Sequence, residues 1–173
     1  MKKYFFLILY YGIFRYFPAS DFPVFGSLSM KLRYICVKHI FKRCGKNVNI
    51  ERMAFFGKGN NIEIGDNSGI GINCIVPPSI VIGENVMMGP NCCFFAHNHR
   101  FDRVDIPMIE QGFYSSKHVT IEDDVWIGRG VMVMPGRTIR KGSIIGAGCI
   151  LTKDFPPYSI VGGNPGKLIR SRS

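Results

Sequence analysis

Large apolar residues return at every sixth position through much of the chain. One series begins at Ile64, and after a break a second series begins at Ile121. Glycine follows the apolar residue in six of the twelve cases, and three positions further on the residue is usually compact, with Ile80 and Arg137 as exceptions. The twelve positions are Ile64, Ile70, Val76, Ile82, Met88, Phe94, Ile121, Ile127, Val133, Ile139, Ile145 and Leu151.

A period of six fits neither an α-helix nor an ordinary flat strand. It fits a coil with three short faces, one hexad to each face, so that three hexads complete one turn. The aliphatic residues then point inward, and stacked turns bury a continuous core. Glycine gives the backbone freedom that the corners need. The pattern therefore predicts an all-β, coiled parallel domain over residues 47–157.

The N-terminal part of the chain lacks this repeat. Lys2 and Lys3 precede an apolar and aromatic run, residues 4–17, which is too short to cross a bilayer and has no cleavage site after it. A second apolar pattern with helical spacing covers residues 28–42. We expect an N-terminal helical arm over residues 1–46, which either packs on the coil or lies at a membrane interface. Residues 158–173 form a C-terminal tail that folds back as a short strand or helix.

Charge is concentrated at the two ends of the chain. The sequence has 22 Lys and Arg against 12 Asp and Glu, but residues 1–46 hold nine basic residues and one acid, Asp21. The middle of the chain is almost neutral. This distribution suggests anionic partners at the ends, such as a phosphate-bearing cofactor or a membrane surface. The six cysteines form no CxxC pair, and we expect them to be small buried residues in a reducing cytoplasm.

The repeat is interrupted between Phe94 and Ile121, which are 27 positions apart, not a multiple of six. A loop must therefore leave the coil, at about residues 100–118, and loops on a rigid scaffold tend to carry function. His97 and His99 stand at the point where the chain exits. An imidazole has a pKa close to working pH, so either histidine would suit a general base that removes a proton from a hydroxyl.

Several segments resemble signatures of the hexapeptide-repeat acyltransferases. Residues 98–102 (NHRFD) resemble the Asn-His-x-x-Asp motif, and residues 124–128 (DVWIG), 145–148 (IGAG) and 152–154 (TKD) resemble the segments that bind the cofactor. Residues 162–167 (GGNPGK) resemble the closing motif, with Gly166 in place of the usual alanine. The resemblance covers residues 47–170. It implies a left-handed parallel β-helix with an extruded loop, and an acetyl-CoA-dependent O-acetyltransferase that acts on a sugar hydroxyl without a metal.

The resemblance also assigns roles to individual residues. It makes His99 the general base, while His97 lines the pocket or is a polar corner residue. Asp102 orients the imidazole, binds the acceptor or caps the loop, and Trp126 walls the pocket or caps a coil edge. Asn73 and Asn85 are candidates for stabilising the oxyanion. The cofactor contacts carried over are Gly128, Gly146, Ala147, Thr152, Lys153, Lys167, Arg170 and, less clearly because the family usually has Ser or Ala there, Arg129.

The family further implies a homotrimer in which His99 of one subunit faces the cofactor coils of its neighbour, and no nucleic-acid partner. Residues 17–21 and 106–112 resemble polysaccharide acetyltransferases of the colanic-acid or capsule type. We therefore expect a glycan acceptor in capsular or exopolysaccharide biosynthesis, and a cytoplasmic enzyme, peripheral at the inner membrane face if the arm contacts lipid. Maltose, galactoside and streptogramin acetyltransferases share the motifs and stay open as alternatives.

Two further classes compete with this interpretation. A γ-type carbonic anhydrase uses the same coil with a three-histidine zinc site, for which His97, His99 and His118 would be the candidates. His97 and His99 are too close together on one corner for that arrangement, and we expect His118 to be structural. A non-catalytic β-helix with an ice-binding surface would need regular threonine rows, but the coil offers Thr120, Thr138 and Thr152 alone.

Overall fold

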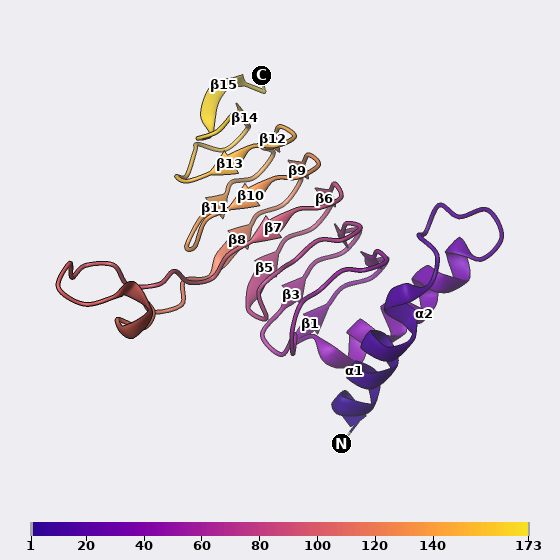
Figure 1. The fold of residues 1–173 in the computed structure, drawn as a ribbon. Helices are drawn as coiled ribbons and strands as arrows, with labels where there is room; N and C mark the ends of the chain where they lie inside the picture. Colours follow the sequence, from indigo (N-terminus) through magenta and orange to yellow (C-terminus); the bar gives the residue numbers. More distant parts are fainter. Residues whose placement is uncertain (1, 173) are drawn as a thin grey trace.

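The computed structural model describes residues 2–172 as a three-sided, left-handed parallel β-helix that two helices cap at its N-terminal end (Figure 1). The helices are α1 (Lys2–Gly12) and α2 (Gly26–Ile40), with the short 3-10 turns η1 (Phe14–Tyr16) and η2 (Met108–Glu110). A hairpin-like loop projects from the middle of the coil, on the left of Figure 1.

Each side of the coil is a parallel sheet of very short strands. The first face contains β1 (Arg43–Cys44), β3 (Glu63–Ile64), β5 (Ile80–Ile82), β8 (Val119–Ile121) and β11 (Thr138–Ile139). The second face contains β2 (Asn49–Ile50), β4 (Gly69–Ile70), β6 (Met87–Met88), β9 (Trp126–Ile127), β12 (Ile144–Ile145), β14 (Ser159–Gly162) and β15 (Lys167–Ser171). The third face contains β7 (Cys93–Phe94), β10 (Met132–Val133) and β13 (Ile150–Leu151). We call the corners between them edge 1–2, edge 2–3 and edge 3–1.

The register confirms that three hexads complete one turn. Ile64 pairs with Ile82, and Met132 pairs with Ile150. Eleven of the twelve predicted inward residues are buried, and Met88 is half-buried. Because burying an aliphatic side chain of this size stabilises a fold by roughly 1.5–3 kcal/mol, this column supplies much of the stability of the coil. Cys74, Cys92 and Cys149 are buried beside it as free thiols.

The first turn of the coil is longer than the others. Arg43 pairs with Glu63, and Asn49 pairs with Gly69, 20 positions on in each case. The coil thus begins at β1, before the expected boundary at residue 47. The additional length of this turn disturbs the period of six, which explains why the apolar series becomes regular only from Ile64.

The helical arm packs on the open N-terminal end of the coil. Tyr10 of α1 is fully buried, donates a hydrogen bond to the Ala54 carbonyl at 3.0 Å, and contacts the Phe56 ring. Cys36, Val37 and Ile40 of α2 are buried in the same cluster. The first helix ends at Gly12, before the end of the apolar run at Phe17, and η1 follows it. Within residues 2–172, no helix combines the length and apolar character needed to span a membrane.

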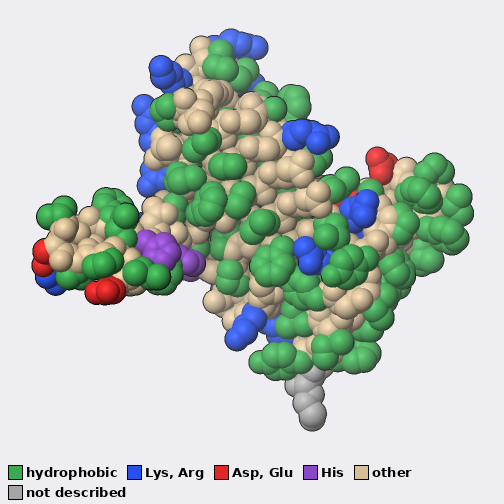
Figure 2. Space-filling view, viewed as in Figure 1, with side chains coloured by type: hydrophobic (Ala, Val, Ile, Leu, Met, Phe, Trp, Pro, Cys, Tyr) green, Lys and Arg blue, Asp and Glu red, His purple; other side chains and the backbone are tan. Residues whose placement is uncertain are grey.

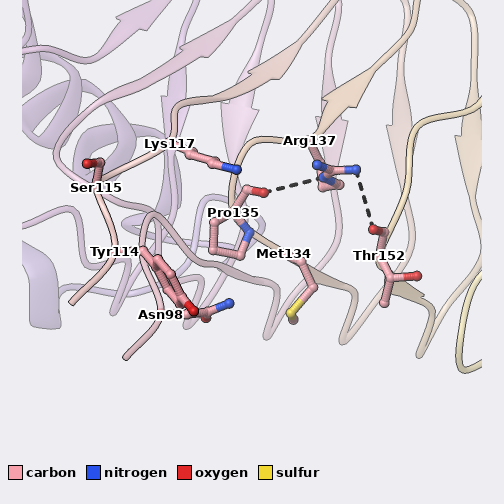
Figure 3. A pocket seen from close by; sticks show the side chains of 8 residues that line it. All are labelled: Asn98, Tyr114, Ser115, Lys117, Met134, Pro135, Arg137 and Thr152. Carbon is pink, nitrogen blue, oxygen red and sulfur yellow. Dashed lines mark hydrogen bonds between the residues drawn. The ribbon is translucent and has the colours of Figure 1, made fainter. Parts of the chain in front are cut away.

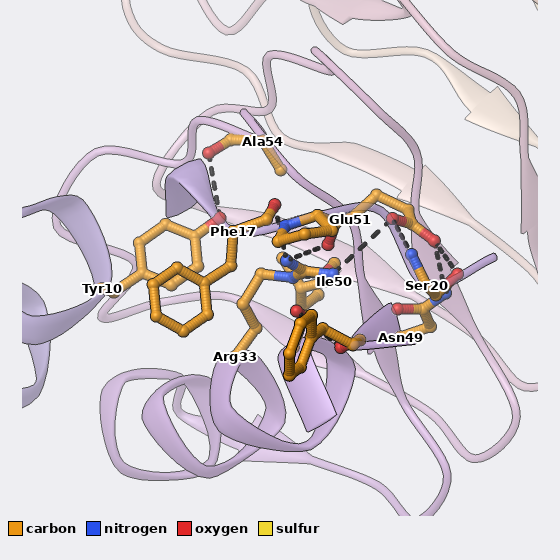
Figure 4. Close-up of polar contacts among 11 residues, drawn as sticks. Tyr10, Phe17, Ser20, Arg33, Asn49, Ile50, Glu51 and Ala54 are labelled. Atoms are coloured by element: carbon orange, nitrogen blue, oxygen red, sulfur yellow. Dashed lines mark hydrogen bonds and ion pairs between the residues drawn. The ribbon is translucent and has the colours of Figure 1, made fainter. Parts of the chain in front are cut away.

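A buried arginine fastens the arm to the coil (Figure 4). The Arg33 Nε donates to the Ile50 carbonyl at 2.5 Å, and Nη1 donates to the Phe17 and Pro18 carbonyls at 3.3 and 3.0 Å. Its Nη2 lies 3.7 Å from Oε2 of Glu51. Burial acts to raise the pKa of Glu51, but hydrogen bonds from Ser20 and Asn49 and the charge of Arg33 outweigh it and lower the pKa.

The C-terminal end of the coil is covered differently on each face. On the second face, β15 returns antiparallel to β14. On the third face, the Ile150 N–H donates to the Gly163 carbonyl at 3.1 Å, and the Ile150 carbonyl accepts from the Gly166 N–H at 2.8 Å. On the first face, an Asp154 carboxylate oxygen accepts the Thr138 N–H at 3.1 Å.

Candidate active site

The interruption of the repeat is a two-armed excursion at edge 3–1. Ile82 pairs with Ile121, 39 positions on, whereas Ile64 pairs with Ile82 only 18 positions on, so this turn carries a long insertion. Its arms are hydrogen-bonded to each other: Lys117 N–H to the Ala96 carbonyl at 2.7 Å, and Tyr114 N–H to the Asn98 carbonyl at 3.0 Å. The excursion therefore starts at Ala96, earlier than the expected residue 100, and His99 lies on its outgoing arm. We call residues 96–118 the hairpin loop.

Both candidate histidines pack against one aromatic ring. The ring centroid of Phe113 lies 4.1 Å from that of His99 and 5.1 Å from that of His97. His99 and Phe113 also face each other across the two arms of the hairpin loop. Both imidazoles are exposed, and the histidines in Figure 2 lie at the base of the projecting loop. The position of His99 is thus defined by backbone pairing and by a ring contact, and its imidazole remains accessible to a substrate.

Asp102 holds a tyrosine. It accepts hydrogen bonds from the Tyr114 hydroxyl and, at 3.3 Å, from the Arg100 Nε. The Tyr114 hydrogen bond lowers the pKa of Asp102 and raises the pKa of Tyr114. Among the described residues, Asp102 makes no hydrogen bond to His99. Of its three predicted roles, capping the loop agrees with these contacts and orienting the imidazole does not, while binding the acceptor stays a prediction.

A pocket of about 430 Å³ opens between the hairpin loop and edge 3–1 (Figure 3). Asn98 and Tyr114 border it from the loop, one residue from His99 and Phe113 respectively. Arg137 is fixed on the coil side, since its Nη1 lies 3.5 Å from Oδ1 of Asp154 and its Nε donates to the Pro135 carbonyl at 3.4 Å. The lining is mixed, with hydroxyls, an amide and two cations: Asn98, Tyr114, Ser115, Lys117, Met134, Pro135, Arg137 and Thr152.

The residues predicted to contact the cofactor fall into separate groups on one chain. Thr152 and Lys153 follow β13 at edge 3–1, the same edge as the hairpin loop. The second group lies at edge 2–3 and comprises Gly128, Arg129, Gly146 and Ala147, which follow β9 and β12. Trp126 is 51% exposed on the second face, which lies between edge 1–2 and edge 2–3. Lys167 and Arg170 are exposed on β15. A single chain therefore does not bring all of them to His99.

The two candidate oxyanion residues are corner residues. Asn73 and Asn85 both have φ of 56°, the left-handed conformation that a corner requires and that asparagine tolerates. Asn85 lies at edge 1–2, where its Oδ1 accepts from Nδ2 of Asn67 at 3.2 Å, and Asn73 lies at edge 2–3. Neither stands on the edge that carries His99, so neither can serve the His99 of its own chain.

The remaining histidines have structural contacts. A 2.6 Å hydrogen bond joins His118 Nδ1 to Ser79 Oγ, and the His39 ring stacks on Phe6 with centroids 4.2 Å apart. No group of three or more His, Cys, Asp or Glu side chains within residues 2–172 is arranged to hold a metal ion.

The sequence did not predict several residues of the site. Phe113, Tyr114 and Lys117 lie on the return arm of the hairpin loop, where no periodicity marks them. Arg137 had a signal, because it is a charged residue at a hexad position that is usually compact. That exception was visible in the sequence, but its meaning depends on the neighbouring loop.

Comparisons with known proteins agree with this architecture. Residues 118–153 match the bacterial transferase hexapeptide (six repeats), and residues 61–93 match the hexapeptide repeat of succinyl-transferase. The galactoside O-acetyltransferase of Escherichia coli is 36% identical over 136 residues, which cover 78% of this chain and 66% of that protein. The chain spans 58–68% of the length of the first curated relatives it matches.

Two solved structures cover nearly the whole chain. A galactoside acetyltransferase in complex with coenzyme A superposes with a TM-score of 0.81 at 31% identity, over 99% of this chain and 81% of that one. A maltose O-acetyltransferase from Clostridium difficile 630 superposes with a TM-score of 0.79 at 29% identity, over 99% and 87%. The repeat matches within the coil, the sequence identity over 78% of the chain and the structural match over 99% of it agree, and the chain therefore belongs to the hexapeptide-repeat acetyltransferase family.

Proposed function

We propose that this protein transfers the acetyl group of acetyl-CoA to a sugar hydroxyl, with His99 as the general base. The observation that carries the proposal is the break in the coil: the hairpin loop presents an accessible imidazole at the same edge as Thr152 and Lys153. The coenzyme A complex of the galactoside acetyltransferase relative supports the donor.

The chemistry requires one residue to move a proton twice. Neutral His99 removes the hydroxyl proton as the acceptor oxygen attacks the acetyl carbonyl, and a C–O bond forms while the C–S bond breaks. The imidazolium then returns the proton to the leaving thiolate. The imidazole is suited to both steps because it changes charge near neutral pH. Asp102 and Tyr114 support this arrangement indirectly, by bracing the hairpin loop beside His99.

A three-fold assembly would complete the site. Outward side chains are apolar on the second face, at Met87 and Trp126, and on the third face, at Ile75 and Met132, whereas the first face carries Arg43, Glu63, Val81, Thr120 and Thr138. A closed head-to-tail trimer needs two different complementary faces on each subunit. With the third face of one subunit opposite the second face of the next, edge 2–3 of every subunit lies at the three-fold axis. Edge 3–1, which carries His99, Thr152 and Lys153, then lies beside the outer part of the neighbour's second face, which carries Trp126.

The acceptor proposed is a glycan of capsular or exopolysaccharide biosynthesis, modified in the cytoplasm where acetyl-CoA is available. The pocket that Asn98 and Tyr114 border supports a polar acceptor, because Asn98, Tyr114, Ser115 and Lys117 offer hydrogen bonds toward it. His97 and His99 are not among the residues that line it. A free sugar is the second candidate, which the galactoside and maltose acetyltransferase relatives favour.

An acetyl-CoA consumption assay tests both the role of His99 and the class of acceptor. The acceptors are galactosides, maltose, and nucleotide-linked and lipid-linked glycans, assayed with the wild type and with His99→Ala. We expect kcat/KM to fall roughly 100- to 10,000-fold in His99→Ala, the range for a removed general base. His118→Ala is the matched control and should keep its activity, since His118 bonds Ser79. Full activity in His99→Ala, with loss in His97→Ala instead, would transfer the role to His97.

A further inference from the structure

The helical arm exposes an unusual number of large apolar side chains. Ten of the 25 exposed large apolar side chains of the described chain lie in residues 2–46. Ile8 and Val24 are each 72% exposed. Figure 2 shows these side chains gathered over the arm and over the connection between its helices, on the right of the view. We define the arm surface as Tyr4, Phe5, Ile8, Phe22, Val24, Phe25, Leu28 and Ile35.

The arm surface points away from the coil. The inner sides of the two helices are occupied, since Tyr10 of α1 and Cys36, Val37 and Ile40 of α2 are buried in the core. The Phe6–His39 stack joins the start of α1 to the end of α2, so the helices are antiparallel and share one outer side. This outer side lies at the N-terminal end of the prism (Figure 1).

Basic residues are interleaved with the arm surface. On α2, Lys31 and Lys38 each follow an apolar member, Leu28 and Ile35, by three positions, which places them on the same helix face. Both lysines are exposed and form no ion pair within residues 2–172. Asp21 is the single acid among nine basic residues in residues 1–46.

This combination selects one kind of partner. A second copy of the arm would bring the same positive charge against itself, which disfavours self-association through this surface. An anionic bilayer offers apolar depth for the aromatic and aliphatic side chains and negative headgroups for the lysines. The helix α1 has 11 residues, about 16 Å at 1.5 Å per residue, so it suits a position in the interface rather than across the membrane.

We propose that the arm surface docks the protein on the surface of an anionic lipid bilayer, with α1 and α2 lying in the interface and the coil standing away from the membrane. This docking does not depend on the role of His99. Its consequence for the acceptor does rest on the proposed function: a docked coil would hold the hairpin loop near glycans that are anchored in lipid.

Vesicle flotation tests the docking. The full-length protein is floated with vesicles of phosphatidylcholine alone and with vesicles in which phosphatidylglycerol replaces part of it. We expect binding to the anionic vesicles, weaker binding to the neutral ones, and release by added salt. Lys31→Glu with Lys38→Glu should weaken binding roughly 30-fold or more, from the loss of two basic contacts with the membrane surface. Ile8→Ser with Val24→Ser should weaken binding to anionic vesicles even in low salt.

Two controls carry a single substitution of the same kind on the coil, Val81→Ser on β5 and Lys141→Glu at edge 1–2, and both should float like the wild type. Thermal melting checks that every variant folds. Wild-type protein that fails to float, or that floats equally well with neutral vesicles in high salt, overturns the proposal. Arm variants that float normally also overturn it; a changed molecular mass in those variants would show that the surface joins subunits. Loss of acetyl transfer in His99→Ala with unchanged flotation would separate the two proposals.

Discussion

At the residue scale, the close spacing between turns explains why glycine follows an inward apolar residue in many hexads. A Cβ on Gly71 would lie 2.6 Å from the Met88 carbonyl oxygen and closer still to that of Gly89, both backbone atoms of the next turn. Backbone atoms in a paired strand cannot move aside without breaking the ladder. The hexad glycine is therefore a steric requirement of stacking at this position.

We predict that Gly71→Ala lowers the free energy of unfolding by about 3 kcal/mol, because overpacking against backbone cannot relax. Chemical denaturation followed by circular dichroism measures the change. Gly12→Ala is the control: nothing lies within 4 Å of a Cβ there, and alanine favours the end of α1. Equal stability of the two variants would show that the turns can separate at Gly71.

Glu51 links stability to pH. Its pKa is lowered in the folded protein, so its contribution is fully present above the ordinary glutamate pKa and is lost as the pH falls through the lowered value. We predict that Glu51→Gln costs about 2–4 kcal/mol at neutral pH, because Arg33 is left buried without its ion-pair partner. The variant should also lose less stability than the wild type as the pH falls from about 5 to about 3, a range that spans roughly the ordinary glutamate pKa and the values below it.

The control for this prediction is Glu63→Gln. Glu63 pairs with Lys42 at 2.7 Å on the surface, where solvent screens the two charges, so Glu63→Gln should change the stability little. Denaturant titrations across the pH range compare the three proteins. A Glu51 variant as stable as the Glu63 variant would mean that Arg33 is satisfied by its carbonyl contacts alone.

At the element scale, the hairpin loop is an insertion into an otherwise continuous coil. Removing residues 97–117 reduces the sequence separation of Ile82 and Ile121 to that of Ile64 and Ile82. The deletion therefore restores a turn of three hexads. The ends of the excision are adjacent, as the Lys117–Ala96 hydrogen bond of 2.7 Å shows. The coil needs none of the removed side chains for its inward column.

We predict that deletion of residues 97–117 leaves a folded coil with a similar melting temperature but abolishes acetyl transfer. Circular dichroism and the acetyl-CoA consumption assay measure the two properties. The intact chain with His99→Ala is the matched control for lost activity without lost structure. A deletion variant that does not fold would mean that the hairpin loop organises edge 3–1, rather than being carried by it.

The sequence predicted the regular elements well, because one inward position per hexad is a strong local signal. It was less successful where the period is broken. The additional length of the first turn hid β1 and β2, and the pairing of His99 with Phe113 left no trace in spacing. The signature around His99 is the ground for proposing it as the base. Tyr114 and Arg137 belong to the candidate site through contacts between segments that no repeat relates.

At the scale of the whole molecule, two faces of the prism are apolar outside and one is polar. We predict a mass in solution of about three times the 19.5 kDa of the chain, since a closed head-to-tail trimer buries both apolar faces of every subunit. Met132→Glu on the third face should shift the mass toward the monomer, because it places a charge in an apolar contact.

Thr120→Glu on the polar first face is the matched control and should keep the wild-type mass. Size-exclusion chromatography with light scattering measures all three proteins. A monomeric wild type would contradict the trimer, and it would leave His99 without the Trp126 of a neighbouring subunit.

The coverage of the C-terminal end has a consequence for solubility. Nothing in the pairing of parallel turns limits their number, and the unpaired strand edges of the last turn would pair with further chains and form a fibril. Here the last strand of each face is covered in a different way. The antiparallel strand β15 covers the second face, a loop hydrogen-bonds both backbone groups of Ile150 on the third face, and the Asp154 carboxylate takes the place of a next turn on the first face. The final residues thus act as a terminator, and they set the length of a repeat that its own hydrogen bonding would otherwise extend without limit.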